Sequence, residues 1–208
     1  MSSSFKMAVL AFLFAIVFSQ CSTPSSTMIV DSWSDYEYKT SGFRNILVVG
    51  IARRSEVRTS FEYELKSHLK SKNIEVVASS DVMPLDEKID AETFHKYFDD
   101  KGIEAVFVTR LVAVDELPSN SNTNKTQHLD ADSFYEYYDS HYGTEAEEVM
   151  DKQNLILKVE TNLYETKGQK KVWSCTSKSF QQGQTAKLLD DLAKTIADAA
   201  KEDGFVMR

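Results

Sequence analysis

A strand–helix–strand pattern between residues 45 and 79 restricts the possible folds of this chain more than any other feature. The run NILVVGI (45–51) is continuously apolar, which is typical of a strand covered on both faces. The next segment predicts an amphipathic helix with Ser55 as its N-cap, because apolar side chains recur every four residues at Val57, Phe61, Leu65 and Leu69. The run IEVVAS (74–79) predicts a second strand. The three elements together predict a right-handed βαβ unit.

Further elements follow the same alternation. Asp90 and Gly102 predict the start and the end of a second helix, and residues 103–117 predict a long strand. An earlier strand is predicted at 28–33. Near the C-terminus, alternating apolar residues in 154–166, the turn KGQ and the run 170–180 predict an antiparallel hairpin. A last helix is expected to begin near Thr185, with Leu188, Leu189, Leu192, Ile196 and Ala200 on one stripe.

These elements predict a mixed α/β (α+β) fold in one domain that spans residues 28–208. We expect one mixed sheet of about five to six strands, packed by about three helices. Its first half is a parallel βαβ arrangement and its C-terminal part an antiparallel hairpin.

The N-terminal residues predict export. Lys6 precedes an apolar run, Met7 to Phe18, that is too short to span a bilayer, so residues 1–20 are interpreted as a signal peptide. Cleavage before Cys21 would expose a cysteine for lipidation, whereas cleavage after Ser19 would release a secreted or periplasmic protein. The segment VFSQCSTPSS resembles a bacterial lipobox, although Phe18 and Gln20 depart from its pattern. We expect lipidation of Cys21, with residues 21–27 as lipidated cysteine and tether.

The charge of the chain excludes one class of partner. The formal net charge is −8, and nucleic-acid binding requires clustered Lys and Arg, so no nucleic-acid partner is expected. The expected partners are the membrane, through lipid on Cys21, and an envelope protein. We expect attachment to the outer membrane on its periplasmic face.

Residues 118–152 have a different composition from the rest of the chain. PSNSNTNKTQ (118–127) is typical of a loop, and residues 130–151 contain eight Asp and Glu but no Lys or Arg. Tyrosine is enriched in binding surfaces. We therefore expect an exposed acidic insertion with three possible roles. It is a solvated loop, a partner-binding segment formed by Tyr135, Tyr137, Tyr138 and Tyr142, or an oxygen-rich loop that holds calcium weakly.

No motif in the chain identifies a reaction. GIARRS (50–55) precedes a helix but lacks a phosphate-binding glycine pattern, and the four histidines lack metal-ligand spacing. Cys175 and Trp173 alternate on the predicted hairpin and are expected to face the core. We therefore expect no catalytic residue, no metal and no cofactor, and a chain that is not an enzyme. The alternative is an envelope hydrolase whose site is assembled from loops.

Four segments resemble a family of uncharacterised bacterial envelope lipoproteins. They are FRNILVVGIARRSEVRTSFEYELKSHLKSKNIEVV, GIEAVFVTRL, VETNLYE and KVWSCTSKSF. The resemblance implies a lipidated cysteine, a small α/β domain and a location in the cell envelope, without implying an activity. The corresponding functional hypothesis is a non-catalytic binding or envelope-assembly module.

Overall fold

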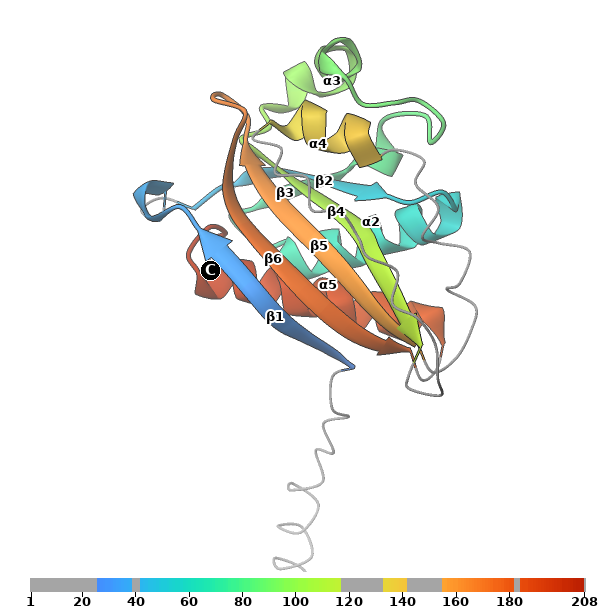
Figure 1. The fold of residues 1–208 in the computed structure, drawn as a ribbon. Coiled ribbons are helices and arrows are strands. Elements are labelled where there is room, and N and C mark those ends of the chain that lie inside the picture. Colours follow the sequence, from blue (N-terminus) through green and yellow to red (C-terminus); the bar gives the residue numbers. More distant parts are fainter. Residues whose placement is uncertain (1–25, 39–41, 117–132, 142–154, 182–183, 208) are drawn as a thin grey trace, which may run out of the picture.

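A computed structural model describes residues 26–38, 42–116, 133–141, 155–181 and 184–207. It contains one open, mixed sheet of six strands in the order β1-β6-β5-β4-β2-β3 (Figure 1). Strands β2 (Asn45–Ile51), β3 (Glu75–Ala78) and β4 (Ala105–Glu116) are mutually parallel, with β2 in the centre. The predicted α/β class and mixed sheet are therefore confirmed.

The other half of the sheet is antiparallel. Strands β5 (Leu155–Glu165) and β6 (Lys170–Gln181) form the predicted hairpin, and β5 also pairs with β4. Strand β1 (Thr27–Ser34) pairs with β6 and is the edge of the sheet, with a bulge between Ile29 and Asp31. The first strand of the chain thus lies beside the last one, at the opposite edge from β3.

Two layers of helices cover the sheet, and the strands alternate their side chains between them. Helices α2 (Ser55–Leu69) and α5 (Thr185–Glu202) pack on the face that includes Ile46 and Val48. Helices α3 (Ala91–Phe98) and α4 (Phe134–His141) pack on the face that includes Leu47 and Val49 (Figure 1). The continuous apolar run of β2 follows from this burial on both faces.

Three short 3-10 helices, Tyr36–Tyr38, Ser79–Asp81 and Asp99–Lys101, complete the described secondary structure. The Asp90 side chain caps α3 in a capping box with Thr93, as Asp90 predicted. Gly102 follows in the left-handed conformation, with φ of 59°. The expected cap of α2 is wrong, because Arg54 occupies the N-cap position and Ser55 is the first helical residue.

Candidate functional site

The tyrosine-rich segment is more buried than its composition predicted. Residues 134–141 form α4, which sequence analysis did not anticipate, and the side chains of Phe134, Tyr137 and Tyr138 are buried in the core. Tyr135 is half-buried against Phe94 and Phe134. The expectation of an exposed insertion is therefore wrong for these residues, since their rings supply apolar area that the α3–α4 layer needs. Tyr142 lies outside the described residues.

Tyr137 belongs to a buried polar network. Arg110 on β4 donates from Nε to the Tyr137 hydroxyl at 2.8 Å and from Nη2 to Glu160 Oε2 on β5, also at 2.8 Å. The Tyr137 hydroxyl donates to the same Glu160 oxygen at 3.1 Å. Burial and the adjacent Glu160 carboxylate raise the pKa of Tyr137 well above its usual value. The arginine and glutamate compensate each other's charge, so the network fixes α4 on the sheet.

Asn162 lies two residues beyond Glu160 on β5 and is 1% exposed. Within the described part of the chain, neither atom of its carboxamide has a hydrogen-bond partner. A buried amide without partners is costly, because neither water nor protein replaces its lost hydrogen bonds.

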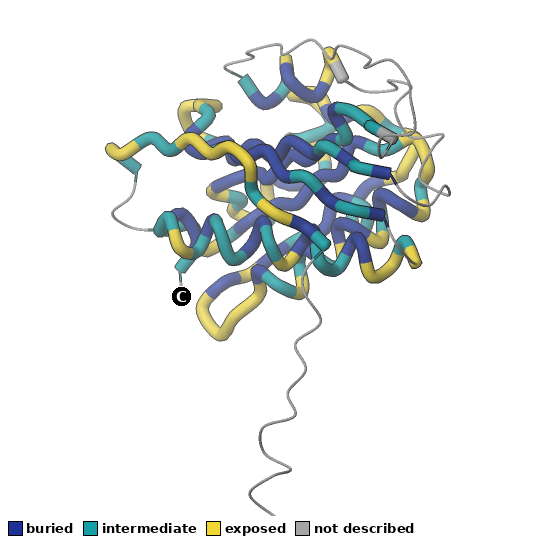
Figure 2. Tube along the Cα trace, turned by 60° about the horizontal axis from the view of Figure 1, so that its bottom comes forward, coloured by how far each residue is buried: buried dark blue, intermediate teal, exposed yellow. Residues whose placement is uncertain are grey.

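The surface of β1 and the following 3-10 helix concentrates exposed apolar side chains. Among the described residues, six large hydrophobic side chains are exposed, and four of them lie here: Met28, Val30, Trp33 and Tyr36. Figure 2 shows the exposed course of β1 next to buried strands. We call these four side chains the β1 surface. Apolar clusters of this kind mark interaction sites.

An open groove of about 630 Å³ adjoins the β1 surface. Its lining residues are Ser32, Trp33, Ser34, Asp35, Tyr36, Glu37, Lys170 and Asp203. Lys170 Nζ lies 2.7 Å from Asp35 Oδ2, and this hydrogen bond lowers the pKa of Asp35. Asp203 accepts a hydrogen bond of 2.7 Å from the Trp173 indole. The groove therefore combines aromatic faces with carboxylates that are held in place.

A second, much smaller cavity of about 40 Å³ lies at the carboxyl ends of β2 and β4, between α2 and α5. Neighbouring parallel strands whose helices cover opposite faces form a switch point, where open α/β sheets usually bind ligands. The lining is mainly apolar and includes Val57, Phe61, Leu189 and Leu192. The volume accommodates about one to three water molecules, so the cavity is too small for an organic ligand.

The other predicted residues are placed as follows. Trp173 and Cys175 are buried, as their alternation on the hairpin predicted. Burial raises the pKa of the Cys175 thiol to about 12. Cys21 lies outside the described residues. No helix in the described ranges is long and apolar enough to cross a bilayer.

One group of metal-ligating side chains within the described residues was missed by sequence analysis. Glu64 and His68 on α2 meet Asp190 on α5. Spacing within one segment does not reveal such a group, because Asp190 is 122 residues from His68. The only sequence signal was the pair Glu64 and His68, which are four residues apart on one side of a helix.

Comparisons with known proteins give one family match. The model of the family Protein phosphatase 2C matches residues 109–204, which extend from within β4 to just beyond the end of α5 and make up less than half of the chain. No curated protein sequence is significantly similar to this chain. The expectation that the chain is not an enzyme is contradicted by the family match and must be corrected. Nothing in the lone histidines or in the βαβ pattern pointed to a phosphatase.

Distant structural similarity is also found. The PelC dodecamer from Paraburkholderia phytofirmans has 11% identity and a TM-score of 0.46, with 88% of this chain and 99% of that chain covered. A PDZ domain protein from Parabacteroides distasonis has 11% identity and a TM-score of 0.37, with 88% and 35% covered. Neither similarity is close enough to support a conclusion about function.

Proposed function

We propose that this protein is a lipid-anchored protein of the bacterial cell envelope that self-associates through the β1 surface. The observation that carries the proposal is the gathering of four of the six exposed large hydrophobic side chains on β1 and its 3-10 helix. In a monomer these side chains stay in water and contribute little to the free energy of folding. Burying a side chain such as Met or Val in an interface between copies contributes ~1.5–3 kcal/mol to association.

The position of β1 in the chain supports a partner at the same membrane. Strand β1 begins at Thr27, six residues after the expected lipid site Cys21. An extended chain spans ~3.3 Å per residue, so β1 would begin within roughly 20 Å of the bilayer. All anchored copies would hold their β1 surfaces at the same height, and confinement to one membrane raises their effective concentration.

The details of the edge favour a closed pair over open-ended strand addition. The bulge between Ile29 and Asp31 interrupts the regular backbone of β1, and such bulges protect sheet edges from indefinite pairing. Side-chain contact between two β1 surfaces across a two-fold axis would bury the same apolar residues from both copies. No β1 surface would then remain exposed for a third copy, so the assembly would stop at a dimer.

Sedimentation of the mature protein in detergent tests this proposal. We expect a reversible dimer that Met28→Asp and Val30→Asp each weaken by roughly 10- to 100-fold, because each removes ~1.5–3 kcal/mol of burial and introduces a charge. Leu85→Asp is the matched control, since Leu85 is exposed but distant in sequence from the β1 surface. A protein that remains monomeric at high concentration, or a dimer that resists both β1 substitutions, would refute the proposal.

The family match supports a second candidate, hydrolysis of phosphate esters. Phosphatases commonly use two metal ions held by carboxylates. In the described residues of the matched segment, Asp190 alone belongs to a group of three metal-ligating side chains. The test is turnover of p-nitrophenyl phosphate by the mature protein with Mg²⁺ or Mn²⁺, and its loss in EDTA. No turnover above that of the metal ions alone would refute this candidate.

A further inference from the structure

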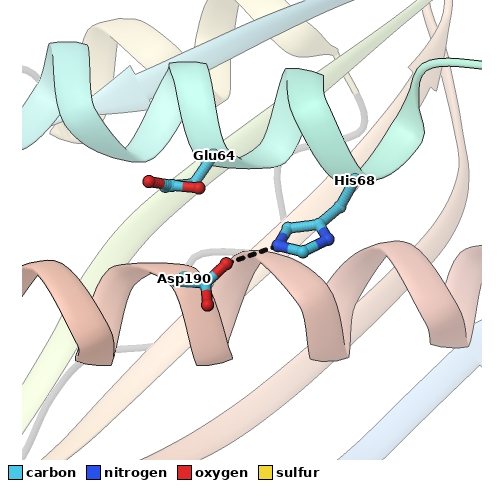
Figure 3. Close-up of side chains that lie close together, drawn as sticks. All are labelled: Glu64, His68 and Asp190. Carbon is cyan, nitrogen blue, oxygen red and sulfur yellow. Dashed lines mark hydrogen bonds and ion pairs between the residues drawn. The ribbon is translucent and has the colours of Figure 1, made fainter.

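We propose that Glu64, His68 and Asp190 form a binding site for one divalent transition-metal ion of the zinc class, at the seam between α2 and α5. This site goes beyond self-association through β1 and does not depend on it. Each of the three side chains offers one ligand atom, and these atoms all lie within 4.8 Å of one another. Figure 3 shows the three side chains lying between the two helices.

The packing of α2 and α5 in the core holds the three residues close together. Glu64 and His68 are one helical turn apart, so their side chains leave α2 on the same side. The buried residues of α2 and α5 join one apolar cluster on the same face of the sheet. Lys201, in the last turn of α5, donates to the backbone carbonyl of His68. The ligands are therefore positioned by rigid elements, which favours a defined geometry.

The two carboxylates of the group differ in their protein partners. His68 Nε2 lies 2.6 Å from Asp190 Oδ1 in a hydrogen bond (Figure 3). Within the described part of the chain, the Glu64 carboxylate takes part in no hydrogen bond or ion pair. Two carboxylates thus face a single imidazole, and a divalent cation between them would neutralise both.

The donor set selects the class of metal. One imidazole nitrogen and two carboxylate oxygens suit zinc and neighbouring first-row ions, whereas Mg²⁺ and Ca²⁺ prefer all-oxygen sites. The His68 and Asp190 side chains are 27% and 49% exposed, so an ion has access from solvent. Three protein ligands with solvent access leave a fourth position for water, which is the pattern of zinc sites that are not purely structural.

Only small movements are needed for binding. Zinc bonds of ~2.0–2.2 Å in a tetrahedron place ligand atoms about 3.3–3.6 Å apart. The His68–Asp190 pair must therefore open from its hydrogen-bonded distance of 2.6 Å, while the most distant atoms of the group close from up to 4.8 Å. Changes of side-chain torsion angles provide displacements of this size without moving either helix.

Titration of the full mature protein in detergent with Zn²⁺, and separately with Co²⁺, tests the site. We expect saturable binding of one ion and the visible absorption of tetrahedral Co²⁺. His68→Ala and Asp190→Asn should each weaken binding by more than the roughly 10–100-fold that loss of an outer-shell partner costs. Asp190→Asn keeps the size and the hydrogen bond of the native residue, so the fold should be retained. Circular dichroism checks that each variant is folded.

The chain provides a matched control. His95 and Asp99 form an equivalent pair at 2.8 Å on the surface, and in the described residues no third ligand joins them. His95→Ala should therefore leave Zn²⁺ affinity unchanged. The proposal is overturned if the native protein binds Zn²⁺ no more tightly than the double variant His68→Ala/Asp190→Asn does. It is also overturned if His68→Ala and His95→Ala reduce the Zn²⁺ affinity equally.

Discussion

Replacement of Trp173 by alanine should destabilise the fold more than any change at the other tryptophan, Trp33. Trp173 lies on β6 with its ring fully buried between the sheet and α5. Its ring meets Phe107 edge-on, with 6.0 Å between ring centres. Its indole nitrogen donates to Asp203, which follows α5, at 2.7 Å. The side chain thus joins the hairpin, the central sheet and the last helix.

The magnitude follows from these contacts. A buried aromatic ring removes 150–250 Å² from water, which at ~25 cal/mol per Å² corresponds to roughly 4–6 kcal/mol as an upper estimate. Measured truncations of buried Phe and Trp to Ala cost ~3–5 kcal/mol. We therefore expect Trp173→Ala to lower the free energy of unfolding by ~3–5 kcal/mol, a large share of the ~5–15 kcal/mol typical of a domain. Trp173→Phe should cost less, because it keeps most of the apolar area.

Urea unfolding followed by far-ultraviolet circular dichroism measures this loss without relying on either tryptophan as a fluorophore. Trp33→Ala is the control, because that ring is 47% exposed on β1 and should contribute far less to folding. A loss below about 1 kcal/mol for Trp173→Ala, or equal losses for both tryptophans, would show that the ring does not join the three elements as described.

Three further predictions concern separate parts of the chain. Cys21→Ser should move the protein from the detergent phase to the aqueous phase, and a native mature protein that begins at Gln20 would contradict lipidation. The Cys175 thiol should resist thiol reagents until the protein unfolds. Burial raises the pKa of this thiol to about 12, so the folded state binds the thiol proton more tightly than the unfolded state does, whose thiol pKa is ~8.5. The contribution of the thiol to the free energy of unfolding should therefore fall as the pH rises from ~8.5 to 12, and Cys175→Ala should lack this fall. Tyr137→Phe should cost ~1–3 kcal/mol in urea unfolding by leaving Arg110 and Glu160 short of one partner, whereas Tyr135→Phe should cost almost nothing.

Local sequence patterns predicted the elements whose residues carry a clear period. The four-residue spacing in α2 and the uninterrupted apolar run of β2 depend only on which faces those segments bury. The helix start at Asp90 could also be predicted, because the capping box involves residues only three apart in the sequence. Composition misled in residues 130–151, where acidic residues suggested solvent but the aromatic rings of α4 fill the layer beside α3.

The sequence by itself determined the class of fold, the hairpin and the inward direction of Trp173 and Cys175, because these follow from periodicity within single segments. Only the tertiary structure brought β1 to the sheet edge beside β6, and so exposed Met28 and Val30 together. It also joined Asp190 to Glu64 and His68, which no spacing along the chain records. Pairing of distant segments depends on how the apolar faces of the sheet and the helices are buried against one another. This burial is determined by the complete chain and not by any one segment.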